Sequence, residues 1–238
     1  MARILVGIII ALVLVWAAYK GILYYYMDYV HPFPKVDDNH SNALLISDSI
    51  GFGMLAMCQK KHLYRNILKE AYKDSFILYG LTVNGATLSR NNPRSIMDYV
   101  NWEKAVNHKY QRVFIQLGTN DSKNDVWQGE DTFIKDLEEH LSKIRHRSPQ
   151  CKIVLIGPPP IYKVHNQDVY NYDMNLDHLL TIERLLQNYA ETHELEFVPM
   201  MEDSLNFKPY LKIDGVHPNK KGHQMIANQI LKTIKIDE

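Results

Sequence analysis

Three short segments carry residue types that together could catalyse acyl transfer. Ser49 stands in the segment SDSIG (residues 47–51), Asn120 in GTND (118–121), and an Asp/His pair in DGVH (214–217). A serine hydroxyl attacks a carbonyl carbon when a histidine takes its proton and a carboxylate orients that histidine. A side-chain amide can stabilise the resulting oxyanion. This combination predicts Ser49 as nucleophile, with His217 and Asp214 as its base and orienting acid.

Each segment also has a simpler structural explanation. Asp48 and Ser49 suit the N-cap of a helix, and Asn120 could cap the next one. The Asp-x-x-His spacing recurs at residues 28–31 and 37–40, so spacing alone decides nothing. The copy at 214–217 differs in context, because it follows the last predicted strand and Gly215 frees its backbone. The order of all the segments, rather than any one of them, favours a catalytic site.

Alternating apolar runs and helix-like segments predict the elements that position these residues. We expect strands at residues 43–47, 75–79, 113–117, 153–156 and 196–198, and helices near 50–70, 94–107, 130–147, 173–193 and 219–235. The runs at 113–117 and 153–156 are apolar throughout, as in strands that are covered on both faces. This alternation over about 195 residues indicates an α/β fold with a parallel, doubly wound sheet.

The candidate residues all follow predicted strands. The carboxyl ends of parallel strands meet at one edge of a sheet, which is where open α/β folds bind ligands. Gly85, in VNGAT (83–87), follows the second strand and could add a backbone N–H to the oxyanion site. A simple turn glycine would look the same. We expect Ser49, Gly85, Asn120 and the 214–217 segment to meet at this edge.

The four segments resemble the sequence blocks of the SGNH/GDSL hydrolase superfamily, in the same order. The Gly-Asp-Ser-Leu block appears as SDSI, with Ser47 in place of Gly and Ile50 in place of Leu. The other blocks match at Gly85, at 118–121 and at 214–217, so the resemblance covers about residues 43–235. Residues 117–123, followed by GPPP at 157–160, resemble the arylesterase and acetylesterase branches. The segment around Ser49 also resembles a nucleophile elbow, but an α/β-hydrolase places several strands before its serine, which disfavours that fold.

The resemblance implies a flavodoxin-like three-layer α/β/α sandwich with a central parallel sheet and a serine esterase activity. Ser49, Asp214 and His217 would be catalytic. The backbone N–H groups of Ser49 and Gly85 and the Asn120 amide would form the oxyanion hole. No cofactor and no metal is expected.

Composition and charge restrict the partners. The chain has 27 basic and 27 acidic residues and no basic run, which argues against a nucleic-acid partner. Without residues 1–30 there remain 25 basic and 26 acidic groups, a net charge of −1. The two cysteines, Cys58 and Cys151, have no metal-ligand spacing, and their pairing stays open. Three aromatic residues, Trp127, Tyr162 and Tyr170, could line a substrate pocket or simply pack.

The N-terminus predicts a membrane anchor. Residues 4–19 are apolar and follow Arg3, and a helix continued to Met27 would be ~36 Å long, enough for a hydrocarbon core of ~30 Å. Lys20 would snorkel, and several tyrosines would form an interfacial belt. We expect an uncleaved, single-pass signal-anchor with the catalytic domain outside the cytoplasm. A cleaved signal peptide, which would leave a secreted protein, and a buried core helix are the alternatives.

The sequence thus predicts a signal-anchor at 1–30, a Pro-containing linker at 31–42 and a hydrolase domain at 43–238. The expected activity is hydrolysis of short-chain O-acyl esters, such as O-acetyl groups on a glycan, through a Ser49 acyl-enzyme. An O-acyltransferase, a lysophospholipase or thioesterase, and a silent glycan-binding module are the alternatives. The oligomeric state is left open.

Overall fold

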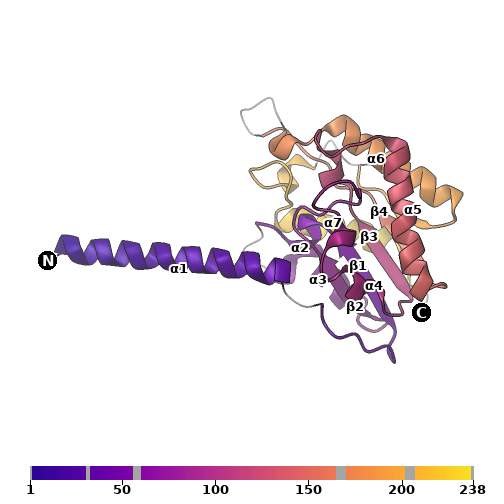
Figure 1. Ribbon diagram of the computed structural model, residues 1–238, viewed down its shortest axis with the longest axis horizontal. Coiled ribbons are helices and arrows are strands. Elements are labelled where there is room, and N and C mark those ends of the chain that lie inside the picture. The colour runs from indigo at the N-terminus through magenta and orange to yellow at the C-terminus, as the bar shows by residue number, and fades with distance from the viewer. Residues whose placement is uncertain (1, 31–32, 56–59, 165–169, 202–206, 237–238) are drawn as a thin grey trace. The chain divides into compact units, whose positions relative to one another are not determined.

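The computed structural model describes residues 2–30, 33–55, 60–164, 170–201 and 207–236. The chain divides into two compact units, Met1–Pro32 and Phe33–Glu238. The first unit contains one helix, α1 (Ala2–Val30), and the second is an α/β domain (Figure 1). The two units are described separately below.

The α/β unit is built on a five-stranded parallel sheet in the order β2-β1-β3-β4-β5. Its strands are β1 (Asn42–Ser47), β2 (Ile77–Thr82), β3 (Arg112–Gln116), β4 (Lys152–Ile156) and β5 (Glu196–Val198). Ser47, the last residue of β1, is in register with Thr82 of β2 and Gln116 of β3. The loops after these three strands therefore start side by side at one edge of the sheet.

Helices alternate with the strands along the chain. The α-helices are α2 (Ser49–Phe52), α3 (Tyr64–Ala71), α4 (Trp102–Val106), α5 (Glu130–Arg147), α6 (Leu176–Thr192) and α7 (Lys220–Thr233). Short 3-10 helices are η1 (Lys60–His62), η2 (Ile96–Asp98), η3 (Asn120–Ser122), η4 (Asn171–Asp173) and η6 (Lys208–Tyr210). The predicted parallel α/β architecture is confirmed, including the five strands.

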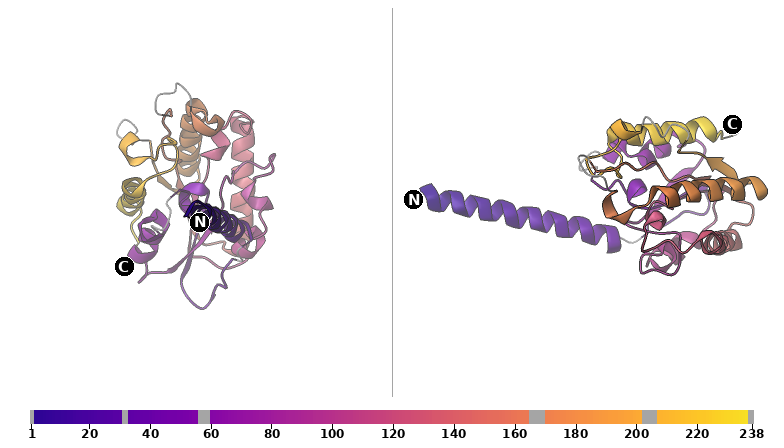
Figure 2. Two further views of the ribbon diagram at one scale, coloured as in Figure 1. Left: turned by 90° about the vertical axis from the view of Figure 1, so that its left-hand side faces the viewer. Right: turned by 90° about the horizontal axis from the view of Figure 1, so that it is seen from above.

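Two hydrophobic cores, one on each face of the sheet, hold the layers together. Successive side chains of a strand point to opposite faces. Leu44 and Ile46 of β1 accordingly pack with α4, α5 and α6, whereas Leu45 packs with α3 and α7. The two groups of helices lie on opposite sides of the sheet (Figure 2). The result is the expected three-layer α/β/α sandwich.

Local structure differs from the prediction in the segment after β1. One helix was expected near residues 50–70, but α2 ends at Phe52 and α3 begins only at Tyr64. Gly53 ends α2 because it adopts the left-handed conformation, with φ 87°, and its N–H donates to the Ser49 carbonyl. The nucleophile candidate therefore stands on a helix of four residues.

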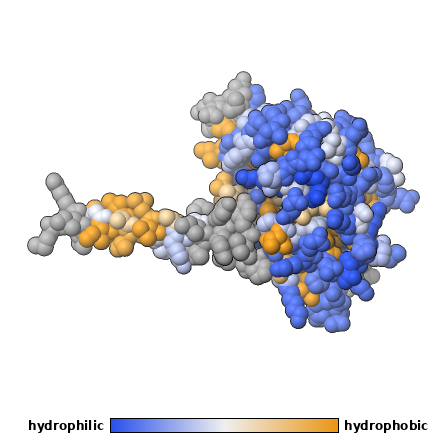
Figure 3. All heavy atoms as spheres, viewed as in Figure 1, coloured by the Kyte–Doolittle hydropathy of each residue, from blue (hydrophilic) through white to orange (hydrophobic). Residues whose placement is uncertain are grey.

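The prediction of an N-terminal transmembrane helix is wrong. Although α1 is 29 residues long, no helix among the described residues combines the length and the apolar character needed to cross a membrane. The stretch from Val6 to Tyr19, whose side chains are described, is apolar and exposed (Figure 3). Export of the second unit stays a prediction.

Candidate active site

Ser49 is the first residue of α2, directly after β1. Asp48 caps this helix, because its Oδ1 accepts a hydrogen bond of 2.8 Å from the Ile50 N–H. Of the two N-cap candidates, Asp48 is thus the one that caps α2. The Ser49 side chain is therefore available for other contacts. Ser49 is 9% exposed, at the carboxyl edge of the sheet. The turn from strand to helix presents its hydroxyl at the edge where ligands bind in open α/β folds.

His217 and Asp214 complete a hydrogen-bonded chain with Ser49. The Nε2 atom of His217 lies 3.0 Å from Ser49 Oγ, and its Nδ1 lies 2.5 Å from Asp214 Oδ2. With Nδ1–H donating to the carboxylate, Nε2 is free to accept the serine proton. His217 and Asp214 are each 7% exposed, so both are largely shielded from water. The structure brings together the three residues predicted to be catalytic.

The loop that carries the pair holds Asp214 in its ionised form. Burial alone would raise the pKa of Asp214, but His217 and the N–H groups of Val216 and His217 lower it below its usual value. Gly215 has φ 71°, and a Cβ there would lie 2.2 Å from the Tyr162 carbonyl oxygen. The tight turn between acid and base therefore requires glycine.

The other described Asp-x-x-His pair forms no such chain. His40 Nδ1 lies 3.0 Å from Asp37 Oδ2, but both side chains are more than half exposed, and no serine joins them. The copy at 28–31 lies outside the residues whose side chains are described. Context after the last strand, rather than spacing, distinguishes the pair at 214–217.

Asn120 and Gly85 lie beside the Ser49 loop. The Asn120 side chain is 5% exposed, and its Nδ2 donates a hydrogen bond of 3.1 Å to the carbonyl of Ala86, the neighbour of Gly85. Gly85 adopts φ 72°, as a tight turn requires. Since their loops follow β3 and β2, on either side of β1, both residues reach the edge where Ser49 stands.

Asp121 joins these two loops, a role that the sequence analysis missed. Its oxygens accept hydrogen bonds from the Ser89 N–H at 2.7 Å and the Leu88 N–H at 3.1 Å. The side chain is fully buried, and burial raises the pKa of this carboxyl despite those bonds. An acid after Asn120 is the only signal in the sequence, and such an acid equally suits the N-cap of a helix.

A buried polar cluster supports the strand end below Ser49. Ser47 Oγ donates to Gln116 Oε1 at 2.6 Å, and the Tyr64 hydroxyl lies 2.9 Å from the same oxygen. A Cβ on Gly51 would lie 2.3 Å from Ser47 Oγ. Ser47, where the related sequence block has glycine, therefore joins β1, β3 and α3, and it makes glycine necessary at position 51.

Tyr172 is a further residue at the site that sequence reasoning did not select. Its hydroxyl lies 3.4 Å from Asp214 Oδ2, and its ring is T-shaped to that of His217 with centroids 5.9 Å apart. Of the aromatic residues proposed instead, Trp127 stacks on His178, Tyr162 packs in the core of α3 and α7, and Tyr170 packs beside Ile161 and Met174. Neither spacing nor hydropathy singles out Tyr172.

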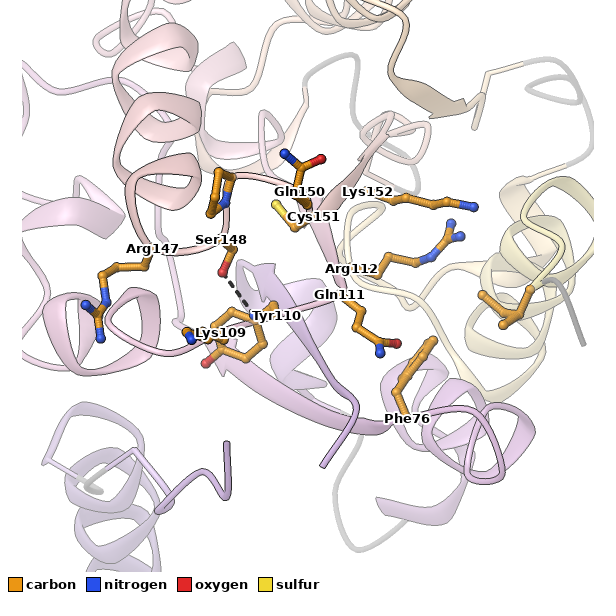
Figure 4. Close-up of a pocket in the computed structure, with 12 residues that line it drawn as sticks. Phe76, Lys109, Tyr110, Gln111, Arg112, Arg147, Ser148, Gln150, Cys151 and Lys152 are labelled. Carbon is orange, nitrogen blue, oxygen red and sulfur yellow. Dashed lines mark hydrogen bonds between the residues drawn. The ribbon is translucent and has the colours of Figure 1, made fainter. Parts of the chain in front are cut away.

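A cavity of about 570 Å³ lies at the opposite edge of the sheet (Figure 4). It includes Arg112 and Lys152, which begin β3 and β4, and Cys151, whose thiol pKa is raised by burial. No residue of the Ser49 chain lines it. Cys58 lies outside the described residues, so its pairing with Cys151 stays open. Among the described residues, no group of three or more His, Cys, Asp or Glu side chains could hold a metal ion.

The fold and the Ser49–His217–Asp214 chain are typical of serine ester hydrolases with a three-layer α/β/α domain. Residues 48–225 match the model of the GDSL-like lipase/acylhydrolase family. The chain belongs to this family, which confirms the predicted superfamily and the class of serine ester hydrolases.

Similar proteins include esterases that act on carbohydrates. An acetylxylan esterase from Xylanibacter ruminicola is 28% identical over 223 residues, which are 86% of this chain and 45% of that protein. This chain thus spans less than half the length of that relative. Solved structures of a carbohydrate acetylesterase from Sinorhizobium meliloti and a lipase/acylhydrolase from Enterococcus faecalis each have a TM-score of 0.62. They are 15% and 19% identical, cover 80% and 81% of this chain, and match 96% and 94% of their own chains.

Proposed function

We propose that this protein is a serine esterase that removes short acyl groups, in particular O-acetyl groups, from a glycan. The observation that carries the proposal is the hydrogen-bonded chain from Ser49 Oγ through His217 to Asp214, at 3.0 and 2.5 Å. These distances suit transfer of the serine proton to Nε2 during attack on an ester carbonyl. The acetylxylan and carbohydrate acetylesterases among its relatives support the choice of an acetylated glycan.

In the first half of the reaction, Ser49 Oγ bonds to the carbonyl carbon and His217 Nε2 receives its proton. The Asp214 carboxylate stabilises the imidazolium by the hydrogen bond at Nδ1. The C–O bond to the alcohol then breaks, and His217 returns the proton to the leaving oxygen. An acyl group on Ser49 and a free glycan hydroxyl remain.

In the second half, His217 accepts a proton from water, whose oxygen attacks the acyl carbon. The bond between the acyl carbon and Ser49 Oγ then breaks, and His217 Nε2 gives the proton to Ser49 Oγ. The carboxylic acid leaves the site. The Asn120 amide and the N–H groups of Ser49 and Gly85 would donate to the oxyanion in both halves. In the described part of the chain, neither N–H is used in a hydrogen bond to another residue.

Hydrolysis of p-nitrophenyl acetate, butyrate and octanoate by the full-length protein tests the activity. We expect turnover that favours acetate and falls at least ~10⁴-fold in Ser49→Ala, since the attacking oxygen is lost. Ser142→Ala removes an exposed hydroxyl from α5 and should match the wild type. Undiminished turnover in Ser49→Ala would contradict the proposal.

Two further outcomes would redirect the function without removing Ser49 from it. A preference for octanoate would indicate a lipid or thioester substrate. Stoichiometric labelling of Ser49 by a fluorophosphonate, with no ester hydrolysis, would indicate an acyltransferase whose acceptor is missing. Analysis of the products formed with acyl donor and glycan acceptor would identify that case.

A further inference from the structure

Tyr172 borders the reacting residues without being packed into a core. Its ring lies against His217, with an interplanar angle of 79°, and its hydroxyl points to Asp214. Yet 46% of Tyr172 is exposed, in contrast to 7% for each of those two residues. Tyr172 thus combines contacts to two residues of the Ser49–His217–Asp214 chain with access to solvent. The accessible part of Tyr172 therefore borders the candidate site.

The backbone holds Tyr172 in this place by an unusual conformation. Tyr172 and Asp173 have φ values of 60° and 58°, in the left-handed region that side chains other than glycine rarely adopt. Such strain persists only where surrounding structure fixes it, and it is frequent at functional sites. A turn with no other constraint would have glycine at these two positions, because glycine adopts positive φ without strain.

The structure that fixes this turn comes from the loop of Asn120. The Asn124 N–H donates to the Asp173 carbonyl at 3.1 Å, and its side-chain amide donates to Asp173 Oδ1 at 3.1 Å. The Asn175 N–H also donates to the Ser122 carbonyl at 3.1 Å. The turn is thus attached to the loop that carries the Asn120 amide. Hydrogen bonds from the loop of Asn120 therefore hold Tyr172 next to Asp214 and His217, which lie on a different loop.

Two more exposed apolar residues belong to the loops of the triad. Leu55 lies three residues after α2, and Ile213 directly precedes Asp214, with 40% and 84% of their surfaces exposed. Ligand sites are lined mostly by apolar side chains with a few polar groups among them. The position suits a leaving alcohol that has an apolar face as well as hydroxyl groups. A sugar ring has both.

We propose that Tyr172 forms the wall of the site against which the sugar ring of the leaving alcohol stacks. This inference rests on the proposed esterase function and names the residue that recognises its glycan substrate. The hydroxyl of Tyr172 contributes less than its ring, because its contact with Asp214, at 3.4 Å, is long compared with the 2.5 Å bond from His217. Tyr172 therefore selects the substrate more than it orients the triad.

Two acetate esters, with and without a sugar ring, test the proposal. The full-length protein is assayed on an acetylated xylo-oligosaccharide and on ethyl acetate, because a p-nitrophenyl group is itself a ring that could stack. In Tyr172→Ala, kcat/KM for the oligosaccharide should fall about tenfold, mainly through KM, which is the upper range for one aromatic contact. The value for ethyl acetate should stay within threefold. Tyr172→Phe should keep both values within threefold and leave the pH profile unchanged.

The control is Leu180→Ala, which removes an equally exposed apolar side chain, 45% exposed, from α6 and should change neither activity.

An equal loss of both activities in Tyr172→Ala would mean that the residue only positions the triad. If neither activity falls in Tyr172→Ala, Tyr172 has no role in recognising the substrate. If the wild type cleaves ethyl acetate through Ser49 but not the oligosaccharide, the serine esterase activity stands, whereas the acetylated glycan as substrate and this inference both fail. If it cleaves neither ester, the proposed function fails first. Thermal unfolding of each variant verifies that it is folded.

Discussion

Replacing Asp48 by asparagine should make the protein more stable at alkaline pH. Asp48 is fully buried, and its Oδ1 accepts the Ile50 N–H, whereas its Oδ2 has no hydrogen-bond partner among the described residues. Burial, chiefly, raises the pKa of this carboxyl to about 7, and the neighbouring Asp121 adds to the effect. Asparagine keeps the oxygen that caps α2 and removes the ionisable group.

The size of the effect follows from the difference between folded and unfolded protein. In the unfolded chain Asp48 ionises near 3.8, but in the folded protein only near 7. The folded state therefore binds more protons between these values, so this group makes the protein less stable as pH rises from about 4 to about 7. Three pKa units correspond to roughly 4 kcal/mol. Above pH 7 the loss is complete, and it is absent from Asp48→Asn.

Urea unfolding followed by circular dichroism at pH 4.5 and pH 8 measures the difference. The stability of Asp48→Asn relative to the wild type should rise by about 3 kcal/mol between these pH values. Asp74→Asn, at an exposed position, should show no comparable rise. A relative stability of Asp48→Asn that is equal at both pH values, or that falls toward pH 8, would refute the reasoning.

Two further substitutions test the loops around Ser49. Asn120→Ala should lower kcat on p-nitrophenyl acetate by about 10²–10³-fold with little change in KM, because the amide is expected to act on the oxyanion; a kcat within threefold of the wild type would exclude that role. Gly215→Ala should cost about 2–4 kcal/mol, because its Cβ would lie 2.2 Å from the Tyr162 carbonyl oxygen, which is backbone. Gly85→Ala is the matched control in thermal unfolding, since it has nearly the same φ but the atoms nearest to its Cβ would belong to the flexible Arg94 side chain rather than to backbone. Equal losses in the two glycine variants would contradict the clash at Tyr162.

The sequence predicted the elements where one physical signal dominates. Helix α5 was expected at 130–147 and is found there, because Phe133, Leu137, Leu141 and Ile144 form a single apolar stripe that faces the core. The five strands are also where they were expected, although β2 runs three residues further than predicted. The helix expected near 50–70 is broken, because apolar periodicity does not reveal that Gly53 turns the chain.

The site was predictable only in part, for a similar reason. Ser49, His217 and Asp214 could be selected from the sequence because their segments follow predicted strands and match, in order, the sequence blocks of the SGNH/GDSL superfamily. The structure brings the three side chains together, and their catalytic role stays a prediction. Tyr172 was missed because its position depends on a strained turn and on hydrogen bonds from Asn124, 48 residues earlier in the chain. The buried state of Asp121 was hidden because an acid after Asn120 is equally suited to an exposed cap. Three-dimensional contacts, which no local pattern contains, decide both cases.

The separation of Ser49 and His217 along the chain has a consequence for synthesis of the protein. The two residues are 168 positions apart, yet their side chains meet at 3.0 Å. At roughly 5–20 residues per second, a ribosome makes the histidine about 8–34 s after the serine. Throughout that interval the nascent chain has the serine but no base to activate it. The Ser49 hydroxyl therefore cannot be activated by His217 until almost all of the α/β domain has been translated.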